Sequence, residues 1–483
     1  MSTVRPRLRV PEPACLNAFE QVPALPAAWL QMRAQLRLVV PAVVGGFDSG
    51  KADALAPIRA KAVRGHLREW WRLMAWAGDF DDLVPPDEAL KHNAQRLRDL
   101  EFHLWGALGT ENSQGTAEAE QGKPSRVGVD VQLGGAPLFV AATALRDQCN
   151  ALSLALHFAC VKGGRHLLEA PLPFEVRVFI DAQGNDWQAT TLQRSLVCWA
   201  ALGGVGGRTS RGMGAVVLTG LRCNWNLPNG VRLQPWPPLP AGQSVPVQAL
   251  GVARGVVLMA GPGGPTTDAQ VALGWGLRRL QKFLQVPDGR PQAMSMSRWP
   301  EARLIRHLTK QHFVSPQDRY HHHDPEFTPP GLPGGQPPAL VAPRLAFGHR
   351  TFEFVRDQVR GATQPDPTRH SILPAGSDRL PSSVLLRPVP LAGGQYGCLV
   401  VQRTDMAGPA LPGLELKPDV EGTPSLRAWD AGWRAGHAGG CAGIAPLEAQ
   451  RGCATGIFDP VQDAGQAFIN LLHHEAQQRR RQR

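Results

Sequence analysis

Arginine side chains recur one helical turn apart in the segment 58–72. The apolar residues in and just after this segment also recur at helical spacing, namely Val63, Leu67, Trp70 and Met74. They predict an amphipathic helix over 58–77. Arg64, Arg68 and Arg72 form a stripe beside its apolar face. Three cations one turn apart repel each other, so the stripe favours a bound anion such as a phosphate. A solvated helix face is the alternative interpretation.

A second segment, 203–214, combines glycine with basic and hydroxyl residues. Its candidate binding residues are Gly203, Gly204, Gly206, Gly207, Arg208, Thr209, Ser210, Arg211 and Gly212. Glycines allow backbone N–H groups to point into one concavity and to approach a phosphate closely, and the two arginines add charge. The segment runs from a predicted helix to a predicted strand, and the GxGxxG spacing fails at Thr209. It is therefore not a dinucleotide-binding fingerprint.

Composition points to a polyanionic partner. The chain has a net charge of +11 and a pI of about 9.7, which favours nucleic acid or an anionic membrane surface. Most of its 51 basic residues are arginine, whose planar fork pairs with phosphate in two places and stacks on bases. Its eight cysteines form no CxxC pair, and the longest apolar runs fall well short of a membrane span. We expect a cytoplasmic protein with reduced thiols, no membrane segment, no cofactor and no metal.

Hydrophobic periodicity predicts an α+β fold. The expected order is a strand ending at Pro41, helices over 58–77 and 87–105, strands over 126–133, 152–158 and 174–180, a helix over 187–202 and a strand over 215–219. This is the order of a ferredoxin-like domain with insertions. The rest of the chain resembles a second, degenerate copy whose last strand is not found. Its expected strands are 256–260, 344–355, 383–389 and 397–402, and its expected helices are 268–284, 300–310 and 461–478.

Domain boundaries follow from these elements. We expect an N-terminal extension over 1–34, a first ferredoxin-like domain over 35–225 with a flexible insertion at 109–124, a proline-rich linker over 226–247, and a second domain over 248–483. The second domain ends in a basic tail.

Together, the two motifs resemble the RAMP superfamily of CRISPR proteins, and within it the first subunit of type III-B (Cmr) effector complexes. Residues 58–72 align without gaps on the helix motif of that family. Glu101, Trp105 and Gly106 resemble its Glu, aromatic and Gly pattern, and 203–214 resembles its signature glycine loop.

The match also has departures. Lys61 and Ala62 stand in place of the family's paired serines, and Glu69 in place of its phenylalanine. Similarity in the second half is weaker and is limited to 343–348 and 378–383.

The resemblance implies two ferredoxin-like, RRM-like domains and a non-catalytic subunit that caps the spacer 3′ end of a guide RNA. Its partners would be the guide crRNA, single-stranded target RNA and other RAMP subunits. The helix residues expected to bind phosphate are Arg59, Lys61, Arg64, Arg68 and Arg72. Trp71 either stacks on a base or lies in the core.

Two other functions stay open. A RAMP endoribonuclease that processes CRISPR repeat RNA would use His66 as a general base. A purely architectural subunit would carry its basic surface incidentally.

Two further patterns imitate known sites. Residues 45–52 approach a Walker A loop, but Ala52 replaces the Mg²⁺-binding hydroxyl and Pro57 interrupts the expected helix. His321 to His323 are adjacent in a proline-flanked loop and favour a solvated segment over a metal site.

Overall fold

The structure is a computed structural model. It describes residues 29–45, 52–84, 89–107, 124–148, 152, 155–156, 165–181, 186–225, 233, 250–259, 261, 264–285, 351–352, 370–374, 382–403, 414–418, 426–429, 465 and 468–473. Several predicted features lie outside these residues: the extension up to residue 28, the insertion 109–124 apart from Pro124, the linker 226–247 apart from Leu233, His321 to His323, and the basic tail.

The first half of the chain builds one four-stranded sheet. Its elements are β1 (Trp29–Leu38), α2 (Ala60–Ala77), α3 (Ala94–Trp105), β2 (Val127–Leu133), β5 (Leu172–Asp181), α6 (Asp186–Leu202) and β6 (Val216–Cys223). The strands lie in the order β2-β5-β1-β6 and every pair is antiparallel. Between β2 and β5 the chain forms β3 (Phe139–Ala141), α4 (Ala142–Gln148) and β4 (His166–Leu168).

Two-residue alternation explains why these segments are strands. In β1 the side chains of Met32, Ala34, Leu36 and Leu38 are buried, whereas Arg33, Gln35 and Arg37 between them are exposed.

The strand predicted over 152–158 is wrong, because its described residues are helical. Leu152, Ala155 and Leu156 are all buried, and their spacing suits one helix face.

The second half supplies two more sheets. The strands β7 (Ala253–Met259), β10 (Val384–Pro390) and β11 (Tyr396–Arg403) pair in the order β10-β11-β7, with α7 (Ala269–Gln285) following β7. The other sheet, in the order β13-β12-β9-β8, consists of β8 (Thr351–Phe352), β9 (His370–Pro374), β12 (Leu414–Pro418) and β13 (Leu426–Trp429). Residues 468–473 are helical, inside the predicted helix 461–478.

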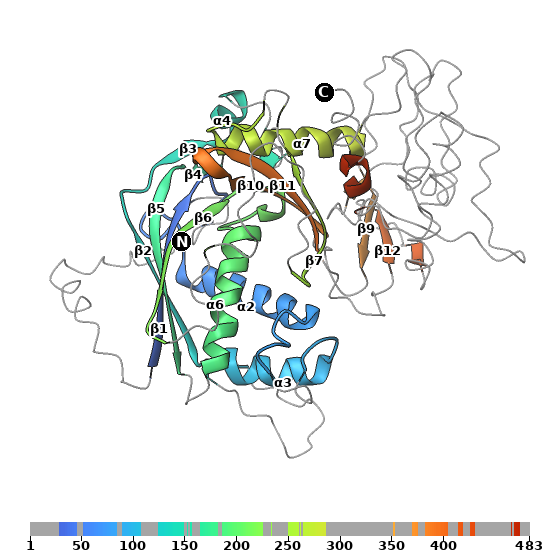
Figure 1. The fold of residues 1–483 in the computed structure, drawn as a ribbon. Coiled ribbons are helices and arrows are strands. Elements are labelled where there is room, and N and C mark those ends of the chain that lie inside the picture. Colours follow the sequence, from blue (N-terminus) through green and yellow to red (C-terminus); the bar gives the residue numbers. More distant parts are fainter. Residues whose placement is uncertain are drawn as a thin grey trace, which may run out of the picture.

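The layers alternate sheet, helices, sheet and helix (Figure 1). The helices α2 and α6 pack on the first sheet and also contact Leu385, Leu399 and Val401 of the second sheet. The opposite face of the second sheet, which includes Leu386 and Val400, packs against α7. The strands β10 and β11 are therefore buried on both faces. In the described part of the chain, no helix combines the length and apolar character that a membrane crossing needs.

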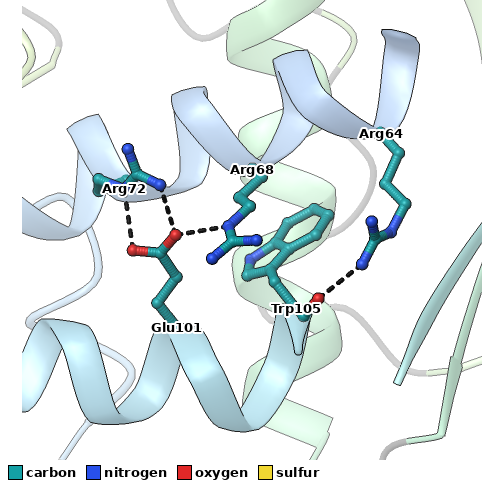
Figure 2. A network of polar contacts seen from close by, with 5 residues as sticks. All are labelled: Arg64, Arg68, Arg72, Glu101 and Trp105. Carbon is teal, nitrogen blue, oxygen red and sulfur yellow. Dashed lines mark hydrogen bonds and ion pairs between the residues drawn. The ribbon is translucent and has the colours of Figure 1, made fainter. Parts of the chain in front are cut away.

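The arginine stripe of α2 faces α3 and meets a carboxylate there (Figure 2). Glu101 of α3 accepts a hydrogen bond from Arg68 Nε at 2.5 Å and from Arg72 Nε at 2.9 Å, and Arg72 Nη2 makes a further contact with it. Glu101 is 6% exposed. Its burial raises the carboxyl pKa, but the hydrogen bonds and charges of Arg72 and Arg68 outweigh burial and lower it. The anion that relieves repulsion between these two arginines is thus a side chain of the protein itself.

Arg64, the third member of the stripe, binds backbone carbonyls. Its Nη2 donates to Trp105 O at 2.6 Å and its Nε donates to Val127 O at 3.2 Å, and its guanidinium carbon lies 5.9 Å from the Trp105 ring centroid. Burial and the charge of Arg68 lower its pKa. Several donors of the stripe are therefore engaged within the protein, which leaves fewer for the RNA phosphate predicted there.

Trp71 lies in the core, which was the alternative predicted for it. The side chain is 0% exposed, and its indole N–H donates to Thr191 Oγ1 on α6 at 2.9 Å. A base has no access to this ring, so the predicted stacking role is wrong.

Replacing Glu101 with Gln removes the charge that two arginines share. We expect Glu101→Gln to lower the free energy of unfolding by about 1–3 kcal/mol at pH 7, because charge-assisted hydrogen bonds are lost and the like charges remain. Urea unfolding measures this loss, with Asp99→Asn on the exposed face of α3 as the control.

The folded-state pKa of Glu101 is lowered, so the stabilisation that Glu101 provides is present above the unfolded pKa and is lost as pH falls through the folded pKa. The difference between Glu101→Gln and the wild type should therefore shrink in acid. A difference that does not change with pH would contradict this role.

Candidate nucleic-acid interface

The glycine loop 203–214 connects α6 to β6 and contains the short 3-10 helix η3 (Thr209–Arg211). Many of its amides are already bonded within the protein. Gly203 N donates to Trp199 O at 2.7 Å, Gly207 N to Val43 O at 2.7 Å, and Gly212 N to Thr209 O at 2.9 Å. The prediction that the glycine amides together form one concavity for phosphate is wrong for these three positions.

Two glycines of the loop lie where it packs closely against the second half of the chain. Gly212 has a φ of 78°, and a Cβ there would lie 2.4 Å from Leu273 Cδ1 of α7 and 2.8 Å from Leu386 O of β10. At Gly204, a Cβ would lie 2.9 Å from Arg387 Nη1. The inner part of the loop is therefore a packing contact between the halves of the chain.

Two buried arginines stand at this contact. Arg387 of β10 is 0% exposed and donates to Ala200 O at 3.3 Å and Ala201 O at 3.4 Å. These carbonyls belong to the last turn of α6, where a cation is favourable, although burial lowers the Arg387 pKa to about 9. Arg211 Nη1 donates to Ser382 Oγ at 3.4 Å. Burial, then the charge of Arg208, lowers the Arg211 pKa to about 10.

Arg211 was predicted to bind RNA, but it is 9% exposed and points to Ser382 of the second half. Its burial makes it part of the packing contact and removes it from the accessible surface. The same holds for Gly203, Gly204 and Gly212, which are buried.

The outer part of the loop, 206–210, is accessible. Gly207 is exposed, and Gly206, Arg208, Thr209 and Ser210 are partly exposed. Arg208 has a φ of 60°, in the left-handed region. Burial, then the charge of Arg165, lowers its pKa, so Arg165 lies close enough to repel it.

The segment 42–45 joins the loop to two other elements. Ala42 pairs with Leu168 of β4, three residues after Arg165, and Val43 pairs with Gly207. Gly45 is close to α2: a Cβ added to it would lie 3.9 Å from Nη2 of Arg59. Arg59 is the N-cap residue of α2 and is exposed. Arg59, Arg165 and Arg208 therefore surround this segment, and we call them the basic cluster.

The structure thus divides the predicted site. Arg59 and the outer loop residue Gly207 both lie beside the segment 42–45, and Lys61 is exposed in the first turn of α2. That turn contains no acidic residue. The arginine stripe and Trp71 belong to the helix packing described above.

Arg165 was missed from the sequence. It follows two glycines in Lys162-Gly163-Gly164-Arg165-His166, a basic glycine-containing segment. That composition was the available signal, but nothing local to the segment indicates that β4 pairs beside the glycine loop.

Two glycines of the loop should respond differently to substitution. Gly212→Ala forces a side chain into backbone contact at a positive φ, and we expect a loss of about 2–4 kcal/mol of unfolding free energy. Gly207→Ala meets only ordinary contact, 3.6 Å to Val43 O, and should change it by less than about 1 kcal/mol. Thermal and urea unfolding of both variants measure this. Equal losses would contradict the division of the loop into a packing part and an accessible part.

Residues 35–217 match the family model of the RAMP superfamily. None of the curated proteins compared with the chain matches it.

Solved structures show distant similarity. Cmr1 from Pyrococcus furiosus, in its apo form, aligns over 82% of this chain and 91% of its own, at 13% identity and a TM-score of 0.39. A type III-B Cmr-beta complex bound to cognate target RNA and AMPPnP contains a chain that aligns over 78% of this one and 94% of its own, at 11% identity and a TM-score of 0.37.

The matched segment begins in β1 and ends in β6. It includes the arginine stripe, Glu101 and the complete glycine loop. The resemblance predicted from these motifs is confirmed, since residues 35–217 match the RAMP superfamily model.

Proposed function

We propose that the chain is a non-catalytic RNA-binding subunit of a CRISPR effector complex of the type III-B (Cmr) kind. In this proposal it works in the cytoplasm in antiviral defence, caps the spacer 3′ end of the guide crRNA and helps to bind single-stranded target RNA. Other RAMP subunits are its protein partners. The RAMP match over 35–217 supports this proposal.

The strand orders support two ferredoxin-like units in this subunit. The first sheet follows the connectivity strand, helix, strand, strand, helix, strand, with β3 to β4 as an insertion. In the second half, β7, α7, β10 and β11 repeat the first four elements, and β10-β11-β7 corresponds to β2-β5-β1. A counterpart of β6 is not among the residues that the structure describes.

The basic cluster is the observation that carries the proposed function. Arg208 is partly exposed in the outer loop, and the like charge of Arg165 lies close to it. An RNA phosphate at the outer loop would relieve this repulsion. A guide has a variable sequence, so its holder must contact the backbone rather than read base edges.

Arg208→Ala tests this proposal without disturbing the packing contact. We expect weaker binding of single-stranded RNA and a log–log salt slope flatter by about 0.7, because one phosphate contact is lost. Fluorescence anisotropy of the full chain with labelled polyuridine at several salt concentrations measures both. Arg98→Ala, an exposed arginine on α3, is the control. Unchanged affinity and slope in Arg208→Ala would remove the outer loop from the site.

The endoribonuclease alternative depends on His66. This side chain is partly buried, and burial lowers its pKa, while Glu69 on the same helix raises it. We expect no discrete cleavage when the purified chain is incubated with repeat RNA in EDTA. Cleavage that His66→Ala abolishes would contradict the non-catalytic assignment.

A further inference from the structure

Arginines lie in a row across the outward face of the first sheet. Arg33 of β1 is directly opposite Arg177 of β5 on one side and Arg222 of β6 on the other. In β1 and β5 buried residues alternate with less buried ones, and Arg33 and Arg177 belong to the less buried set, which points away from the core. Arg33 and Arg222 are exposed, and Arg177 is partly exposed. Three cations thus occupy one row on three neighbouring strands.

Carboxylates compensate one end of this row only. Arg177 Nε lies 2.6 Å from Glu175 Oε1, its Nη2 donates to Gln132 Oε1 at 2.6 Å, and Asp130 of β2 is directly opposite it. Among the described residues, Arg33 and Arg222 have no ion-pair partner. Like charges directly opposite on a sheet are destabilising, so the β1 and β6 side of the face is an uncompensated positive surface.

The face is open in the described part of the chain. Both α2 and α6 pack on the other side of the sheet, and no described element lies over the arginine row (Figure 1). At the far end of β1, Arg37 Nη2 donates to Tyr396 Oη at 3.1 Å. Among the described residues, Tyr396 of the second half contacts this face at that end of β1.

An aromatic ring adjoins the row. Phe179 is two residues from Arg177 on the same face and is partly exposed. Its neighbour on β2 is Gly128, which has no side chain to cover the ring. Partly exposed aromatic rings beside arginines are the combination that binds single strands, since bases stack while phosphates pair with the cations.

We propose that this face, defined by Arg33, Arg222 and Phe179, is a second surface for single-stranded RNA, separate from the basic cluster. The inference rests on the proposed function in that it assigns the face to the same class of ligand. The two surfaces are distinct: Arg33 is five residues before Leu38, which pairs with the start of β6 just after the glycine loop. At about 3.4 Å per residue, the arginine row is about 17 Å from that end of the sheet.

The test uses the full chain and a 30-nucleotide polyuridine probe at several salt concentrations. We expect the double variant Arg33→Gln and Arg222→Gln to bind about 10-fold more weakly, with a salt slope flatter by about 1.4, since two phosphate contacts are lost. Phe179→Leu should weaken binding about 5-fold with an unchanged slope, because it removes stacking but no charge. Arg98→Gln on α3 is the matched control.

The melting temperature shows that the fold survives. Arg33→Gln with Arg222→Gln should keep or raise it, because the substitutions remove repulsion between opposed cations. Weaker RNA binding in an equally stable protein supports the inference.

The RNA-binding results of the variants distinguish failure of the sheet surface from failure of the proposed function. Loss of binding in Arg208→Ala with wild-type affinity and slope in the double variant overturns the sheet surface and leaves the proposed function standing; an acidic protein would then be the better partner for the face. Loss in the double variant alone supports the sheet surface and removes the outer loop. A wild-type chain with no affinity for the probe overturns both.

Discussion

The close approach of backbone at the glycine loop is the constraint on which the rest of the structure depends. The loop leaves α6, passes between the two halves of the chain and enters β6, with Gly212 against Leu386 O. Arg387 binds the last carbonyls of α6 at the same contact. Because this inner part is fixed by packing, the outer residues 206–210 are held in one place beside the segment 42–45. A glycine-rich segment that suggests a flexible phosphate loop is thus a rigid support for a short accessible arc.

The arginines of the first half of the chain differ in the charges close to them. Glu101 pairs with both Arg68 and Arg72 and offsets one of their two positive charges, and this part of α2 packs against α3. Arg208 lies in the accessible part of the loop, where burial and the charge of Arg165 lower its pKa. Repulsion among like charges predicts that an anion is present, but it does not say whether the protein or a ligand provides it. For Arg68 and Arg72 the protein provides it, through Glu101.

Local periodicity was sufficient for most of the elements. The apolar spacing of Val63, Leu67, Trp70 and Met74 predicted α2, and alternation predicted β5. The short apolar segments 383–389 and 397–402 predicted β10 and β11 close to their observed bounds. It failed where a short apolar run such as 152–158 suits either element, because three-dimensional packing then decides. The small strands β3, β4, β9, β12 and β13 were not predicted, since short strands are specified by their partners in the sheet.

At the site, contacts between residues that are far apart in the chain could not be predicted from the sequence either. Glu101 was recognised as part of a family pattern, yet its contact with Arg72 spans 29 positions and depends on how α3 packs on α2. Arg211 and Arg208 are alike in type and close in sequence, but only the position of Ser382 makes one of them a buried donor.

The most direct test of this account is photocrosslinking of the full chain to 4-thiouridine-substituted single-stranded RNA, with the crosslinked peptides identified by mass spectrometry. The account predicts crosslinks in the peptides that contain Gly207 to Ser210 and the first turn of α2. Crosslinks confined to the α2 and α3 surface around Arg68 and Arg72, with none in the outer loop, would contradict it.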